Sequence, residues 1–228
     1  KIARHIKKKT NMKYLCISGG VALNCVANGE LLREGIFDDI WIQPAAGDAG
    51  GAVGCALFTW YQYLENQRKV NNKDDFMKGA YLGPEYKNDT IETFLNTNKY
   101  LYQFLSDIDL PEKISDLIAE EKVIGWFQGR MEFGPRALGA RSIIGDARSP
   151  KMQKTMNLKI KYRESFRPFA PSVRAENISE YFDIDQESPY MLLVANIKKN
   201  KQIEISEEKN SYFGLDKLNM VRSEVPAI

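Results

Sequence analysis

The residues best suited to chemistry are arginines and lysines concentrated in one segment, residues 130–174. Eleven residues there are Lys or Arg and three are Asp or Glu, a formal charge of +8 in a chain of +2, so the rest carries −6. Within it, MEFGPRALGARSII (131–144) places Arg136 and Arg141 five residues apart on a glycine-punctuated stretch. A planar guanidinium suits phosphate or carboxylate oxygens bidentately, and glycines let an anion approach main-chain N–H groups. The segment therefore predicts a site for an anion.

A second basic stretch, KIKYRESFRPFAP (159–171), follows shortly after. Rigid apolar residues flank its Arg167 and are expected to hold the guanidinium in place, namely Phe166, Pro168, Phe169 and Pro171. A solvated charged face is the plainer interpretation of such a cluster, and a long nucleic acid is the rival anion. Nucleic-acid sites usually spread charge and aromatic platforms over a whole domain. The acidic remainder of the chain favours a small polyphosphate or acyl-phosphate pocket.

Composition and single residue types exclude several classes of protein. The 228 residues are 43% hydrophobic and 27% charged, as in an ordinary globular protein with a core. No apolar run is long enough to span a membrane or to serve as a signal core, so we expect a cytoplasmic protein. Cys16, Cys25 and Cys55 lie in apolar stretches and are expected to be buried thiols in a reducing compartment. Because His5 is the only histidine, neither an HExxH motif nor a two-histidine metal site can be built from this chain alone.

The first 66 residues alternate between strand and helix patterns. Short apolar runs predict strands at 14–18 and 39–44. The first is followed by Gly19 and Gly20, which suit either a phosphate at the next helix N-terminus or close packing. The helix after them is marked by Leu23, Ala27, Leu31 and a capping Gly35. The next helix carries an apolar stripe of Val53, Ala56, Leu57, Trp60 and Leu64.

Asp48 stands at the start of that next helix, at the C-terminal end of the second strand. It suits two roles equally: capping the helix, or offering a carboxylate to a metal or a nucleotide-bound magnesium.

The rest of the chain predicts a connector and a second α/β unit. Residues 67–108 are polar and turn-rich, and the second unit covers 109–228. There, Asp109 is expected to cap a helix whose inner face is Ile114, Leu117 and Ile118. Strands are predicted at 123–128 and 190–197, and a helix start at 149–157. Because the chain begins with Lys1 and stops without a capping signal at SEVPAI, we expect a fragment of a longer protein.

Two long motifs, LCISGGVALNCVANGELLREGIFDDIWIQPAAGDAGGAVG and FGPRALGARSIIGDARSPKMQKTMNLKIKYRESFRPFAPSV, resemble the O-carbamoyltransferases of the NodU/CmcH type. The resemblance covers nearly the whole chain. It implies that residues 1–66 are the second half of an actin/Hsp70/sugar-kinase-like domain. It also implies that residues 109–228 are most of a YrdC-like α/β domain that forms adenylated carbamoyl compounds.

The resemblance further implies an activity. The family uses ATP with Mg²⁺ and carbamoyl phosphate to make a carbamoyl-adenylate, and passes the carbamoyl group to a hydroxyl of a sugar or other small natural product. Carbamoyl phosphate and ATP would be neutralised by Arg136, Arg141, Lys161, Arg163 and Arg167. Nucleotide-contacting positions of the first domain would be Gly19, Gly20 and Asn24, and its metal-binding aspartate would be Asp48.

The chain departs from the family in its histidines. Full-length members hold a divalent metal such as iron in the first domain with two histidines, and His5 does not match that motif. No catalytic residue is assigned.

Two further functions stay open at this point. One is a tRNA-modifying relative that attaches a threonylcarbamoyl group. The other is a non-catalytic RNA-binding module, although nucleic acid is the less favoured partner. A membrane partner is not expected.

Overall fold

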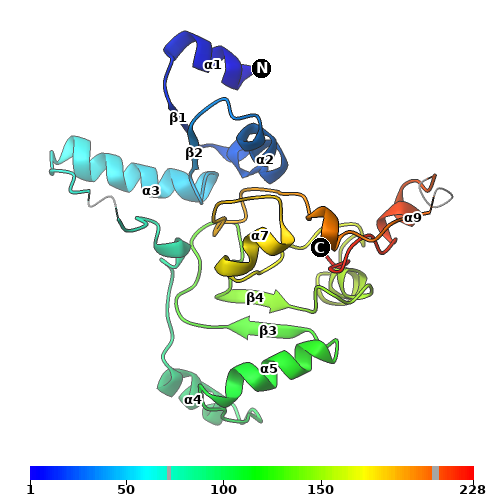
Figure 1. Ribbon diagram of the computed structural model, residues 1–228. Coiled ribbons are helices and arrows are strands. Elements are labelled where there is room, and N and C mark those ends of the chain that lie inside the picture. The colour runs from blue at the N-terminus through cyan, green and yellow to red at the C-terminus, as the bar shows by residue number, and fades with distance from the viewer. Residues whose placement is uncertain (71–72, 207–210) are drawn as a thin grey trace. The chain divides into compact units, whose positions relative to one another are not determined.

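The computed structural model describes residues 1–70, 73–206 and 211–228 (Figure 1). The chain forms two compact units, each built from separate stretches. Unit 1 consists of residues 1–86, 127–141 and 188–194, and unit 2 consists of residues 87–126, 142–187 and 195–228. The predicted domains 1–66 and 109–228, with a connector at 67–108, stay predictions. By contacts, the basic stretch 127–141 belongs to the same unit as the N-terminal residues. Both units mix helices with short strands, so the α/β class is confirmed.

Unit 1 is centred on a two-stranded parallel sheet of β1 (Tyr14–Ile17) and β2 (Asp39–Ile42). Their register pairs Ile17 with Ile42, so both strands end at the same edge. The remaining elements of unit 1 are α1 (Ile2–Thr10), η1 (Gly20–Leu23), α2 (Cys25–Arg33), α3 (Asp48–Phe58), the π-helical turn η2 (Thr59–Tyr63) and η3 (Lys78–Ala80). The predicted strands and helices of the first 66 residues are therefore confirmed.

One face of the β1–β2 sheet is exposed, which overturns part of the cysteine prediction. Tyr14 and Cys16 on β1 and Trp41 on β2 are exposed, whereas the residues between them are partly buried. All three cysteines are free, as predicted, but Cys16 and Cys55 are exposed and Cys25 is only partly buried. The prediction of buried thiols was wrong for two reasons. Cys16 lies on a strand, which alternates its side chains between two faces, and its face is not covered by described residues. Cys55 lies on an exposed side of α3, and Cys25 on a partly covered side of α2.

Unit 2 contains a two-stranded sheet of β3 (Ile124–Phe127) and β4 (Arg141–Ile144), whose end residues Phe127 and Arg141 count with unit 1. The two arrows run in opposite directions (Figure 1). Its helices and turns are α4 (Asn88–Thr97), α5 (Asp109–Ala119), α6 (Met152–Thr155), the π-helical turn η4 (Met156–Ile160), η5 (Ala175–Asn177), α7 (Ile178–Tyr181), η6 (Lys199–Lys201) and α9 (Leu215–Leu218).

The core of unit 2 explains why Gly145 follows β4. The buried residues Met152, Met156 and Ala227 pack together with partly buried Val123, Ile143 and Phe169. A Cβ built on Gly145 would lie 2.7 Å from the Met152 sulfur, below any normal contact distance. Glycine at this position therefore lets α6 and η4 approach the end of β4, which places the second basic stretch directly after a packed helix.

The predicted strand at 190–197 is absent, and this prediction was wrong. Only Ile197 makes a bridge, with Phe182. Backbone carbonyls of this stretch are instead bound by side chains: Asn28 donates to the Leu192 oxygen at 3.0 Å and Arg33 to the Val194 oxygen at 2.8 Å. Apolar content alone cannot tell a strand from an extended loop whose polar groups are satisfied in this way.

Two helix starts differ in detail from expectation. Helix α5 begins at Asp109, but its N-cap position is Ile108 and no side chain makes a cap bond there. The Ser106 hydroxyl oxygen, in the turn before the helix, accepts from the Asp109 amide at 3.1 Å. Helix α6 begins at Met152, three residues beyond Ser149. The Ser149 hydroxyl still accepts from the Lys151 amide, at 3.3 Å. No helix in the described parts of the chain is long and apolar enough to cross a membrane.

Candidate functional site

The first candidate site lies in unit 1, where β1 and β2 end side by side. Ligands of parallel sheets gather at this edge. Gly19 adopts a left-handed φ of 91°, and a Cβ built on Gly19 or Gly20 would meet nothing within 4 Å, so this turn has open space around it. Asn24 already has a structural partner, since its side-chain oxygen accepts from the Ala27 amide at 3.1 Å and caps α2. Nucleotide binding by these three residues stays a prediction.

Asp48 is the first residue of α3 and is exposed. The N-cap position is Gly47, and no side chain makes a cap bond there, so a carboxylate cap is not what Asp48 supplies. Its charge in the first turn is favourable toward the helix dipole. Among the described residues, no group of three or more His, Cys, Asp or Glu side chains could hold a metal ion. A metal role for Asp48 stays a prediction, and we assign no chemical step to a metal.

The glycine-rich loop 129–141 is folded around one carboxylate, that of Glu132. This side chain is 6% exposed, and its Oε1 accepts from the amides of Leu138 at 2.7 Å and Ala140 at 2.8 Å, with Arg141 further off at 3.3 Å. Burial alone would raise the pKa of Glu132, but the amide hydrogens outweigh it and hold that pKa below its usual value. The loop therefore does form an anion-binding nest of main-chain N–H groups, and the anion in it is the chain's own Glu132.

Arg136 connects this loop to the first candidate site. Its Nη2 donates to the Leu23 carbonyl at 2.8 Å, at the end of η1. Gly134, with φ of 117°, lies against the segment after β2: a Cβ there would be 3.1 Å from the Ala45 Cβ. The Nε of Arg136 is buried without a hydrogen-bond partner among the described residues. Arg136 is thus positioned beside the carboxyl ends of β1 and β2, and its Nε is an unsatisfied donor there.

Arg141 is held on several sides by its own unit. Its guanidinium donates to the carbonyls of Gln128 at 3.2 Å, Gly129 at 3.1 Å and Ala140 at 2.8 Å. The Arg141 Cζ also lies 3.4 Å from the centre of the Phe127 ring. These contacts give Arg141 a structural role in closing the loop, while its predicted contact with a phosphate stays a prediction.

The second candidate site lies in unit 2 and is centred on Arg163. Its Nε donates to the Asn157 Oδ1 at 2.6 Å, and its Cζ lies 5.0 Å from the centre of the Phe169 ring. Phe169 was predicted to support Arg167, but its ring contacts Arg163, and Arg167 instead pairs with Glu164 at 3.2 Å. Phe166, the other predicted support, is exposed.

Lys161 precedes Arg163 by two residues and is exposed. Its amide donates to the Met156 carbonyl at 2.9 Å, which closes the π-helical turn η4. Tyr162 then adopts a left-handed φ of 48°, unusual for a large side chain. This backbone reversal ends the helix and directs the chain into the stretch 163–169.

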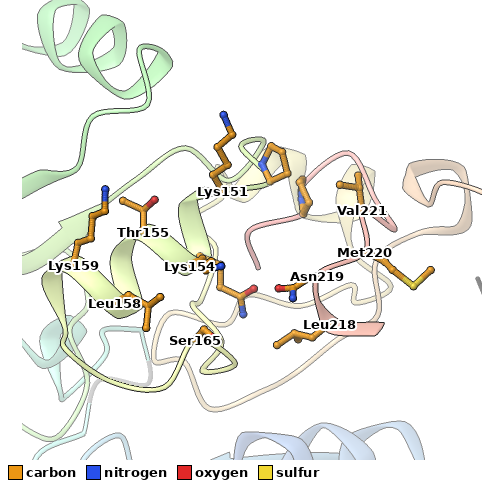
Figure 2. Close-up of a pocket in the computed structure, with 13 residues that line it drawn as sticks. Lys151, Lys154, Thr155, Leu158, Lys159, Ser165, Leu218, Asn219, Met220 and Val221 are labelled. Carbon is orange, nitrogen blue, oxygen red and sulfur yellow. The ribbon is translucent and has the colours of Figure 1, made fainter. Parts of the chain in front are cut away.

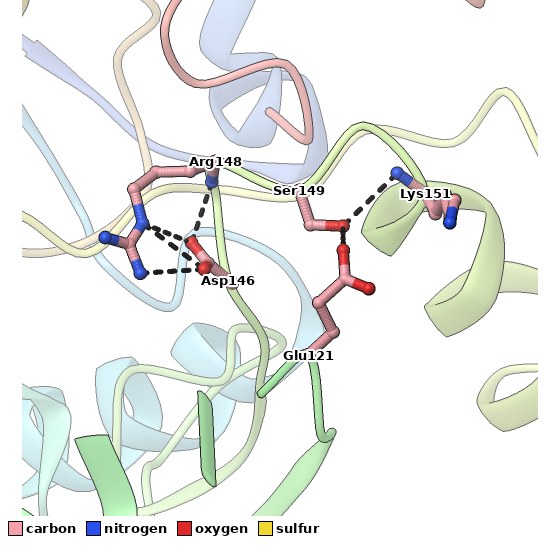
Figure 3. Close-up of polar contacts among 5 residues, drawn as sticks. All are labelled: Glu121, Asp146, Arg148, Ser149 and Lys151. Atoms are coloured by element: carbon pink, nitrogen blue, oxygen red, sulfur yellow. Dashed lines mark hydrogen bonds and ion pairs between the residues drawn. The ribbon is translucent and has the colours of Figure 1, made fainter. Parts of the chain in front are cut away.

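A separate polar cluster, drawn in Figure 3, stabilises the turn after β4. The Asp146 carboxylate is largely buried and accepts from the Arg148 amide, Nε and Nη2 at 2.8–3.2 Å. The Arg148 guanidinium holds the pKa of Asp146 below its usual value. Ser149 donates a hydrogen bond to Glu121. Arg148 is therefore a structural partner of Asp146. In this role Arg148 differs from Arg163.

A cavity of about 360 Å³ lies beside the second site, within unit 2. Its walls come from α6, η4 and the stretch 218–226, and Gln153 and Ser165 are among the residues that line it. Gln153 also donates to the Arg167 carbonyl at 3.2 Å, so the cavity adjoins the backbone of the second basic stretch. In Figure 2, the side chains of Lys151 and Lys159 extend in the same direction, away from Leu218 and Asn219.

The nine predicted site residues thus fall into two sets. Unit 1 holds Gly19, Gly20, Asn24, Asp48, Arg136 and Arg141, and unit 2 holds Lys161, Arg163 and Arg167. Sequence reasoning missed two residues that organise these sets, Glu132 and Asn157. Glu132 was visible as the only acidic residue of its loop. Asn157 had no comparable signal, because a single polar residue in a helical pattern is usually exposed.

The chain matches two family models in sequence order. The Carbamoyltransferase N-terminus matches residues 1–57, and the Carbamoyltransferase C-terminus matches residues 115–225. The chain belongs to the carbamoyltransferase family, as its two motifs predicted.

Three relatives support this assignment. An uncharacterized protein of Synechocystis sp. is 56% identical over 230 residues, which cover 100% of this chain and 37% of the relative. Nodulation protein NolO of Bradyrhizobium diazoefficiens is 41% identical, over 87% of this chain and 36% of its own length. The 3'-hydroxymethylcephem-O-carbamoyltransferase of Streptomyces clavuligerus is 30% identical, over 83% of this chain and 33% of its own length. The chain therefore spans about a third of the length of these curated relatives.

Proposed function

We propose that this chain is part of an ATP-dependent carbamoyltransferase. The whole protein would convert carbamoyl phosphate, ATP and water into a carbamoyl-adenylate, with release of phosphate from carbamoyl phosphate and of pyrophosphate from ATP. It would then transfer the carbamoyl group to a hydroxyl of a sugar or other small natural product. Membership of the carbamoyltransferase family supports the transfer itself. The name of the Streptomyces relative supports an oxygen acceptor.

The observation that carries the donor side of this proposal is the arrangement of Arg163. Its Nε is bound to a buried amide and its guanidinium lies over Phe169. In the described part of the chain, its two Nη atoms have neither a hydrogen bond nor an ion pair. A guanidinium oriented in advance can bind an acyl phosphate without the entropic cost of ordering a flexible cation.

The two substrates explain why such a cation is needed. Carbamoyl phosphate and ATP are both anions and repel each other at reacting distance. Fixed cations that neutralise both lower this barrier, and they do so most strongly where water is excluded. In this proposal, Lys161 and Arg167 supply further positive charge next to Arg163. Arg136, with its buried Nε, would serve an anion at the edge of the β1–β2 sheet.

The test is ATP–pyrophosphate exchange in the full-length protein, measured with and without carbamoyl phosphate. We expect exchange that depends on carbamoyl phosphate, and we expect Arg163→Ala to lower its rate roughly 10- to 150-fold, the equivalent of about 1.5–3 kcal/mol for a charged hydrogen bond. The matched control is Arg174→Ala, because Arg174 lies in the same basic segment but is 79% exposed and pairs with Glu176. ATP consumption that requires threonine and bicarbonate, and ignores carbamoyl phosphate, would replace this proposal with the tRNA-modifying alternative.

A further inference from the structure

Asn157 is the largest side chain that is completely buried among the described residues, with 0% exposure. It lies in η4, the π-helical turn that leads into the second basic stretch. Every polar atom of its side chain has a partner. Its Oδ1 accepts from the Arg163 Nε at 2.6 Å, and its Nδ2 donates to the carbonyls of Ser165 at 3.1 Å and Arg167 at 2.8 Å.

The chemistry of these partners fixes the orientation of the amide. A guanidinium can only donate and a carbonyl can only accept, so the side-chain oxygen of Asn157 must face Arg163 and the nitrogen must face the two carbonyls. The Arg163 amide also donates to the Asn157 carbonyl, at 3.0 Å. One buried residue thus holds both the backbone and the side chain of Arg163.

The bond between Asn157 and Arg163 uses the Nε atom of the guanidinium. Bound at Nε on one side and covered by the Phe169 ring, the guanidinium keeps one orientation, and the pair of Nη atoms is left for a ligand. Two backbone features support a functional rather than a purely structural arrangement. Single π-helical turns occur frequently at functional sites, and a left-handed residue such as Tyr162 persists only where its surroundings demand it.

We propose that Asn157 is a positioning residue for the donor site: it orients Arg163 so that both Nη atoms bind the phosphate of carbamoyl phosphate. This inference rests on the proposed function. Asn157 touches no substrate and acts only through Arg163. Removal of the Asn157 side chain is therefore expected to weaken binding of the anion when Arg163 is present. It has no such effect when Arg163 is absent.

The experiment is a double-mutant cycle on the full-length protein, with the KM for carbamoyl phosphate and kcat measured by ATP–pyrophosphate exchange. Asn157→Ala is expected to raise this KM about tenfold in the natural protein and less than twofold when Arg163→Ala is already present. An equal rise in both backgrounds would overturn the inference, because a merely structural residue acts independently of Arg163.

A second variant covers the case in which Asn157→Ala does not fold. Arg163→Lys keeps the positive charge at the surface but has no Nε–H to donate to Asn157, so we expect the same tenfold rise in KM. We also expect a lower melting temperature, because the buried Asn157 Oδ1 loses its donor. The matched control is Arg174→Lys, which leaves KM unchanged. A KM equal to that of the natural protein in Arg163→Lys would overturn the inference alone. An absence of carbamoyl-phosphate-dependent exchange in the natural protein would overturn both the proposed function and this inference.

Discussion

The two arginine-rich stretches of this chain look alike in sequence and are used differently. In the loop 129–141, the guanidinium of Arg141 donates to three backbone carbonyls. The backbone amides that could bind an anion already donate to the Glu132 carboxylate. In the stretch 157–169, Asn157 accepts a hydrogen bond from the Nε of Arg163 and leaves the two Nη atoms for a ligand. Arginine can therefore close a loop or present a charge, and the deciding factor is how many of its donors are satisfied within the protein.

The largest effect is expected from the carboxylate that organises the first stretch. Glu132→Ala would leave the amides of Leu138 and Ala140 buried without an acceptor. We expect the free energy of unfolding to fall by about 3 kcal/mol, since each unsatisfied buried group costs about 1–3 kcal/mol. Denaturant titration of the full-length protein measures this, with Glu176→Ala as a control at an exposed acid. Unchanged stability would show that the loop does not depend on its internal anion.

A smaller effect is expected at Arg141, and it sharpens the comparison with Arg163. Arg141→Lys removes the guanidinium that donates to three backbone carbonyls, and it weakens the contact with the Phe127 ring. We expect a loss of about 1–2 kcal/mol in stability with an unchanged KM for carbamoyl phosphate. Thermal unfolding and exchange kinetics on the same sample separate the two quantities. A raised KM with full stability would instead make Arg141 a ligand of the anion, and the two stretches would then work alike.

The pH dependence of stability follows from the carboxylates of Glu132 and Asp146, whose pKa values are both lowered in the folded protein. A lowered pKa means that the folded state prefers the charged form, so this stabilisation is fully present above the unfolded pKa of about 4 and is lost as the pH falls through the folded value. Stability measured between pH 6 and pH 3 should decline toward acid. In Glu132→Gln, whose neutral side chain cannot titrate, the decline should be shallower.

The smallest effect is expected at an exposed pair of the same basic segment. Arg174 and Glu176 form an ion pair with both side chains largely exposed. Arg174→Ala should change the free energy of unfolding by less than about 0.5 kcal/mol, because water and salt screen such pairs. A larger change would mean that charge in this segment stabilises the fold irrespective of burial. The difference between arginines bound within the protein and arginines that present their charge to a ligand would then disappear.

Local sequence patterns predicted three of the four strands in the described residues and the helices α2, α3 and α5, but not β4, α1 or α4. The strands at residues 14–17, 39–42 and 124–127 and the helices that begin at Asp48 and Asp109 form where short apolar runs, glycines and helix-start residues placed them. These signals act over a few residues and need no distant partner. The strand expected at 190–197 does not form, because its carbonyls are bound by Asn28 and Arg33, more than 160 residues away.

For the candidate site, the sequence by itself determined the family and the concentration of positive charge between residues 130 and 174. Only the tertiary structure decided which arginines are bound internally. Arg136 donates to a carbonyl 113 positions earlier in the chain, and Arg163 depends on an asparagine that is buried only once η4 packs. A hydrogen bond requires a partner at about 3 Å with the right direction, and which group meets that condition is settled by folding.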